Sequence, residues 1–128
     1  MKKKLLLFAI APIAAIAFSV PLFAHHGTWG YDMQHETTVM GGTITRFDFV
    51  NPHVQIYWET KDDKGVTQMW TAQATNPNTL SRYGWTKEIL KPGTELQMVS
   101  GNRCKSGETC MRLRKIVLAS GKDLPVAD

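Results

Sequence analysis

A series of short strand-like segments, separated by turn signals, constrains this chain most. Within residues 53–60 apolar and polar side chains alternate, so that Val54, Ile56 and Trp58 share one face of an extended segment. The opposite face is polar and carries His53, Gln55, Tyr57 and Glu59. Further strands are expected at residues 39–50, 67–74, 95–101 and 111–118. The pattern predicts a β protein.

Turn and helix signals separate these strands. A glycine pair at residues 41–42 favours a bulge or a sharp coil. The charged residues 61–65 are typical of a hairpin loop. Residues 78–84 are expected to form a short helix, with Asn78 as its N-terminal cap and a glycine at its end.

The order of the elements indicates the fold. Five antiparallel strands with a helix between the third and the fourth predict an all-β fold, a small OB-like Greek-key barrel. This domain is expected over residues 39–124, after an N-terminal segment at 25–38. Because OB barrels bind many kinds of ligand, the fold alone names no function.

Residues 1–24 have the three-part pattern of a cleavable secretory signal. Lysines at 2–4 precede a nearly unbroken apolar run at 5–20, and Ala24 is the small residue before the expected cut. The alternative is a retained N-terminal anchor, although the run is shorter than the ~20 residues of a membrane span. We therefore expect export to the periplasm, with no stable membrane span after cleavage.

Composition argues against nucleic-acid binding and gives little support for an enzyme. The formal net charge is +4, but three of the 15 basic residues lie in the signal, so the mature chain is close to neutral. The sequence has no basic cluster with interleaved aromatic residues, so nucleic acid is not expected as a partner. It also has no glycine-flanked serine elbow and no glycine-rich phosphate loop. A binding protein for a metal ion or small ligand is favoured.

Cleavage after Ala24 would leave a histidine as the first residue of the mature protein. His25 would then offer its α-amine and its imidazole to one metal ion, with His26 beside it. Nitrogen ligands in tetragonal geometry suit Cu(II). The sequence therefore predicts a copper site resembling a histidine brace, used for binding or delivery. The alternative is that both histidines belong to an unstructured terminal stub.

Further ligands must come from the folded domain. His53 follows a proline turn on the polar strand face and is the first candidate; the alternative is an exposed residue at a strand edge. His35 is close enough to the terminus to fold back on it, or else is a solvated loop residue. Met33, two residues before it, is a candidate soft ligand because thioethers select Cu(I).

The two cysteines, Cys104 and Cys110, enclose a short loop between two expected strands. In a small exported protein two nearby cysteines most often pair, so a structural disulfide is favoured. The alternatives are a thiolate copper site or a redox pair. The thiolate site requires reduced sulfur, which an oxidising compartment removes.

A second hypothesis belongs to a different class of protein. The chain could be a metal-free OB-like interaction module that binds an envelope glycan or a partner protein. Its ligand face would carry Gln55 and Tyr57, with Trp85 as an exposed aromatic residue.

Several of these segments together resemble a family of small exported bacterial proteins that is catalogued only as a domain of unknown function. The matching segments are Ala24-His25-His26-Gly27, Gly42-Thr43-Ile44-Thr45, Asn51-Pro52-His53, Arg82-Tyr83-Gly84-Trp85-Thr86 and Leu90-Lys91-Pro92-Gly93-Thr94. The resemblance implies export, a single domain and a role for the histidines of these motifs, but no activity. The chain departs from the family at Gly27, where serine is usual, and in its cysteine pair.

Overall fold

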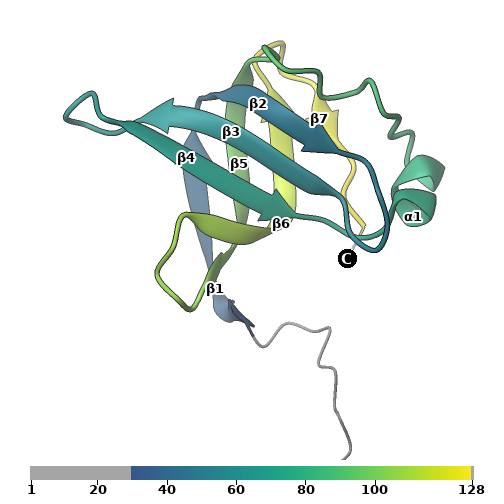
Figure 1. The fold of residues 1–128 in the computed structure, drawn as a ribbon, viewed down its shortest axis with the longest axis horizontal. Helices are drawn as coiled ribbons and strands as arrows, with labels where there is room; N and C mark the ends of the chain where they lie inside the picture. Colours follow the sequence, from purple (N-terminus) through teal and green to yellow (C-terminus); the bar gives the residue numbers. More distant parts are fainter. Residues whose placement is uncertain (1–29, 128) are drawn as a thin grey trace, which may run out of the picture.

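The computed structural model describes residues 30–127, which form a mostly β structure with one short helix (Figure 1). The strands are β1 (Tyr31–Met40), β2 (Thr43–Asp48), β3 (Gln55–Lys61), β4 (Thr67–Gln73), β5 (Leu96–Cys104), β6 (Cys110–Leu118) and β7 (Asp123–Leu124). The helix is α1 (Pro77–Arg82). The expected all-β class is confirmed. Among the described residues, no helix is long and apolar enough to cross a membrane.

The seven strands form one sheet in the order β1-β5-β6-β4-β3-β2, and β7 pairs with β6. Neighbouring strands are antiparallel except for β4 and β6, which run parallel. Although β1 and β2 follow each other in the chain, they lie at opposite ends of this order. At the corner between them, the N–H of Ile44 donates to the carbonyl of Thr94 at 2.9 Å. The N–H of Leu96 donates to the carbonyl of Gly42, also at 2.9 Å, so the start of β2 is bonded to the start of β5.

Gly42 makes this corner sterically possible. Its φ of +120° lies in a region that side-chain-bearing residues rarely adopt. A Cβ atom at this position would stand 2.7 Å from the carbonyl oxygen of Glu59 and 2.7 Å from Cδ1 of Trp58. The glycine pair in the sequence therefore marks a true backbone requirement, as expected.

The apolar face of β3 forms the centre of the core. Val54, Ile56 and Trp58 are each 0% exposed, which confirms the face assignment made from the alternation. The ring of Trp58 stacks on that of Trp70 from β4, with 6.0 Å between the ring centroids. Burying each such large apolar side chain stabilises the fold by about 1.5–3 kcal/mol. These residues hold the polar side of β3 and β4 toward solvent.

The strand count differs from the expected five. The predicted strand at residues 39–50 is two strands, β1 and β2, and strand structure begins already at Tyr31. The first half of β1 carries mostly polar side chains without alternation, so no strand pattern is visible there. Its partner, β5, is distant in sequence and supplies the pairing. The two-residue strand β7 is too short to leave a pattern.

The helix begins two residues earlier than expected. Its N-cap is Asn76, not Asn78, and the Asn76 side chain accepts a hydrogen bond from the N–H of Thr79 at 2.9 Å. The proline after this cap suits the first helical position, because its missing N–H has no partner to lose there. The helix places the buried Leu80 against the core.

Trp85, expected on an exposed ligand face, is instead buried, with 1% of its surface accessible. Its indole Nε1 donates to the carbonyl oxygen of Pro125 at 2.7 Å. Its ring lies 6.2 Å from that of Phe47, between centroids. The expectation of exposure is wrong because the C-terminal segment supplies an acceptor that allows the whole indole to enter the core.

Candidate functional site

Of the predicted metal ligands, His25 and His26 lie outside the described residues. His35 and Met33 lie on β1, and His53 lies just before β3. Among residues 30–127, no three His, Cys, Asp or Glu side chains gather as a metal-binding group. The site must therefore be assessed from the surroundings of each candidate.

His35 forms a close pair with Asp32 on the solvent side of β1. Its Nδ1 lies 2.9 Å from Oδ2 of Asp32, and the histidine side chain is 77% exposed. The hydrogen bond from His35 lowers the pKa of the Asp32 carboxyl, as does a second one from the N–H of Gln34. An ionised carboxylate only accepts hydrogen bonds, so Nδ1 must donate. In the neutral ring, Nε2 then carries the free lone pair. Most metal-binding histidines have this arrangement, with one ring nitrogen donating to a carboxylate or carbonyl and the other free to bind the metal.

A buried asparagine, Asn102 of β5, holds this pair in place. Its Nδ2 donates to the carbonyl oxygens of Asp32 at 3.0 Å and His35 at 3.2 Å. Its Oδ1 accepts from Nε of Arg114 at 2.8 Å. The β1–β5 register is irregular between Tyr31 and Glu36, and this irregularity allows residues three apart to meet. Sequence reasoning missed Asn102, because nothing local marks it.

His53 occupies a different environment from His35. It follows the cis Asn51–Pro52 peptide bond and is partly buried. Its Nδ1 is buried and has no hydrogen-bond partner among the described residues. A buried nitrogen of this kind costs about 1–3 kcal/mol when it is left unsatisfied. By alternation, the His53 side chain lies on the same side of β3 as Gln55.

That side of the sheet carries a set of linked polar residues, which we call the polar face: Tyr31, Arg46, Gln55, Tyr57 and Gln73. The Tyr31 hydroxyl donates to Oε1 of Gln73 at 3.4 Å, and Nε2 of Gln55 donates to the same oxygen at 3.3 Å. Burial raises the pKa of the Tyr31 phenol, against an opposing effect of the Arg112 charge. The start of β1 therefore contacts the side of β4 that faces the same way as His53.

The other half of the polar face contains a stacked cation. The guanidinium carbon of Arg46 lies 5.1 Å from the centre of the Tyr57 ring. The same guanidinium pairs with Asp48 at 2.7 Å. Tyr57 is partly buried, and Gln55 beside it is bonded to Gln73. Two of the three residues predicted for a ligand face, Gln55 and Tyr57, thus lie together, whereas Trp85 does not join them.

Cys104 and Cys110 form a disulfide bond, as expected, which leaves no free cysteine in the described part of the chain. The loop between them is also held by Arg103, whose guanidinium donates to the carbonyl oxygen of Gly107 at 3.2 Å. The same guanidinium lies 5.4 Å from the centre of the Trp70 ring. Because the two sulfurs are bonded to each other, neither is a free thiolate in this structure.

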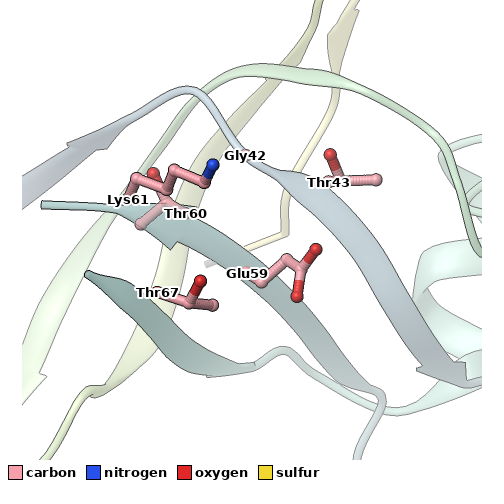
Figure 2. A pocket seen from close by; sticks show the side chains of 6 residues that line it. All are labelled: Gly42, Thr43, Glu59, Thr60, Lys61 and Thr67. Atoms are coloured by element: carbon pink, nitrogen blue, oxygen red, sulfur yellow. The ribbon is translucent and has the colours of Figure 1, made fainter. Parts of the chain in front are cut away.

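A small pocket of about 240 Å³ lies beside the start of β2, the end of β3 and the start of β4 (Figure 2). It is lined by Gly42, Thr43, Glu59, Thr60, Lys61 and Thr67. Figure 2 shows the Glu59 and Lys61 side chains beside three threonine side chains. The described histidines are not among these lining residues, so the pocket is separate from the candidate metal ligands.

Comparison with known proteins identifies a family but no relative of known activity. Neither the curated proteins nor the solved structures gave a match to this chain. The profile of a family described as a family of unknown function, DUF6152, matches residues 14–112, which is most of the chain. The chain belongs to the DUF6152 family.

Proposed function

We propose that this protein is exported to the periplasm and binds copper at its mature N-terminus. Cleavage after Ala24 would free the α-amine of His25, which would chelate Cu(II) together with its own imidazole. The observation that carries the proposal is the 2.9 Å pair between His35 and Asp32. It supplies an exposed imidazole whose Nε2 is oriented for a metal by a carboxylate on the other nitrogen.

The chain length between these groups permits a common site. Tyr31 is six positions after His25, and an extended chain covers at most about 3.3–3.6 Å per residue, so roughly 20 Å is available. His35 stands four residues further along the same strand. His53 is the other candidate for the third nitrogen, because its Nδ1 has no hydrogen-bond partner among the described residues and alternation puts its side chain on the side of β3 that carries Gln55.

The remaining candidates have secondary roles in this proposal. His26 could complete the nitrogen set, and Met33, partly exposed and two residues from His35, would be a soft ligand after reduction to Cu(I). Because no residue pattern of the sequence points to a substrate, we propose binding or delivery of copper in preference to catalysis. The disulfide between Cys104 and Cys110 supports an oxidising compartment.

We also propose that the sheet is an OB-like Greek-key barrel. The parallel contact between β4 and β6 and the bonds from the start of β2 to the start of β5 support this. In this view β1 is an additional strand that carries the candidate ligands to the outside of the barrel.

Copper titration of matched proteins tests the metal proposal. The mature protein that begins at His25 is compared with one that carries a single extra glycine, using competition with a Cu(II) chelator and electron paramagnetic resonance. We expect the extension to abolish tight binding, and His35→Asn to remove one nitrogen from the spectrum. Asp32→Asn should weaken binding about 10–100-fold. The control is Asp48→Asn. The Asp48 carboxylate pairs with Arg46, so this substitution should leave the copper affinity unchanged.

Two results would reject this proposal. The first is equal copper affinity for the authentic and the extended protein. The second is an affinity of the authentic protein weaker than micromolar. If the extension matters and His35→Asn has no effect, the same measurement on His53→Asn decides whether that residue is the third ligand.

A second candidate function is recognition of an envelope glycan or a partner protein by the polar face, without metal. The observation that favours it is the Arg46–Tyr57 stack next to the bonded pair Gln55 and Gln73. Tyrosine rings and amide groups are typical of such recognition surfaces. Nuclear magnetic resonance titration with cell-envelope oligosaccharides tests it. Tyr57→Ala should abolish the chemical-shift changes that the oligosaccharide causes. The control, Tyr83→Ala, removes an exposed ring and should leave these changes in place.

A further inference from the structure

Two methionines lie directly opposite each other on neighbouring strands. The β1–β5 register pairs Met40 with Met98, and one position earlier Val39 with Val99. Both valines are buried in the core, so the two methionines share the outer face. Met40 is 64% exposed and Met98 is partly exposed. The usual role of methionine, filling gaps in a core, does not describe Met40.

On one side the pair is flanked by Thr38 and Ser100, whose hydroxyls hydrogen-bond to each other at 2.7 Å. Met98 is opposite Val117 of β6, which is buried but does not belong to the main core cluster. The next residue across on that face is Asp123 of β7. Its carboxylate pairs with the ammonium of Lys115 at 3.3 Å, so the two nearby charges offset each other. The polar and charged neighbours of the thioethers are thus already paired with one another.

We propose that Met40 and Met98 form a binding site for a soft monovalent metal ion, Cu(I). Directly opposite residues in antiparallel strands have Cβ atoms about 4.5–5.5 Å apart, and three rotatable bonds let each sulfur turn toward a shared ion. Thioethers are neutral, soft ligands that select Cu(I) over Cu(II) and over hard cations. This site needs neither the N-terminal amine nor a histidine, so it stands apart from the proposed Cu(II) site.

The methionine methyl groups provide a direct readout. The full mature protein, labelled with 13C at the methionine methyls, is titrated with Ag(I), a redox-inert substitute for Cu(I). We expect the Met40 and Met98 resonances to shift together and saturate at one equivalent. Met69, which is 52% exposed on β4 and has no methionine opposite it, is the internal control and should not shift with them.

Variants then measure affinity with Cu(I) itself, held by a chromophoric Cu(I) chelator. Met40→Leu and Met98→Leu keep the size of the side chain but remove the sulfur, and each should weaken binding at this site at least tenfold. Met69→Leu should leave it unchanged. If Met40 and Met98 do not shift, or if Met69 responds with the same midpoint, the pair is no site and the proposal is overturned. Because the N-terminal glycine extension removes only the proposed Cu(II) site, its effect distinguishes failure of one proposal from failure of the other.

Discussion

The buried Asn102 should control both the stability of the domain and the geometry of the candidate site. Replacing it with alanine removes two donor bonds to β1, at 3.0 and 3.2 Å, and the acceptor for Nε of Arg114 at 2.8 Å. A typical hydrogen bond contributes about 0.5–1.5 kcal/mol net, and more when one partner is charged. Asn102→Ala should therefore lower the free energy of unfolding by about 2–4 kcal/mol.

Two assays separate the global effect from the local one. Urea denaturation gives the change in the free energy of unfolding, provided that the transition is two-state. Hydrogen exchange should show faster exchange at the β1 amides near residues 32–36, because their anchor on β5 is gone. The matched control is Ser100→Ala on the same strand. It removes only the 2.7 Å bond between the Ser100 and Thr38 hydroxyls and should cost about 1 kcal/mol.

The anchor that Asn102 provides for β1 should also affect copper binding. If Asn102 positions His35 through the β1 backbone, Asn102→Ala should weaken Cu(II) affinity while the ring of His35 is still present. A loss of less than about 1 kcal/mol in stability, together with unchanged exchange of the β1 amides, would refute the reasoning. The polar contacts of Asn102 would then be replaceable by water.

Three further predictions concern the fold. Gly42→Ala should lower the free energy of unfolding by at least about 2 kcal/mol, as measured by urea denaturation. Gly41→Ala should lower it clearly less, because Gly41 has φ +68° but open space around it. Equal losses in the two variants would contradict a steric role for Gly42. Trp85→Phe removes the hydrogen bond to the Pro125 carbonyl and should lower the free energy of unfolding by about 1–2 kcal/mol. The near-ultraviolet circular dichroism spectrum should change as well. An unchanged melting temperature would contradict a stabilising role for this hydrogen bond. Hydrogen bonds from the backbone N–H groups of Val66 and Lys64 lower the pKa of the Asp62 carboxyl. The ionised carboxylate therefore stabilises the folded state above the unfolded pKa of about 3.9, and this stabilisation is lost as the pH falls through the lower folded pKa. The stability difference between wild type and Asp62→Asn should accordingly narrow as the pH falls below about 4, and a constant difference would exclude the carboxylate as its source.

Much of the central sheet was predictable from local pattern. Alternation placed Val54, Ile56 and Trp58 on the buried face, and these residues are 0% exposed. The charged residues 61–65 turn between β3 and β4, and the cysteine pair closes the loop between β5 and β6. Each of these features depends on residues close together in the sequence, whose spacing reflects the strand period or a turn.

Part of the candidate site was also foreseeable. His35 and Met33 could be named because their side-chain chemistry suits copper. The partner Asp32 could not, because residues three apart on a regular strand point to opposite faces. Only the irregular register at the start of β1 brings their side chains to 2.9 Å.

The sequence by itself determined which side chains of β3 face the core, where the chain turns and which cysteines pair. The tertiary structure decided that β1 joins the sheet, that Trp85 is buried and that His35 has a fixed carboxylate partner. These outcomes depend on contacts between distant residues, such as Asn102 with Asp32, which are 70 positions apart. Such a contact leaves no periodicity or spacing in either segment, because each hydrogen-bonding group is satisfied by a residue that only the folded chain brings near it.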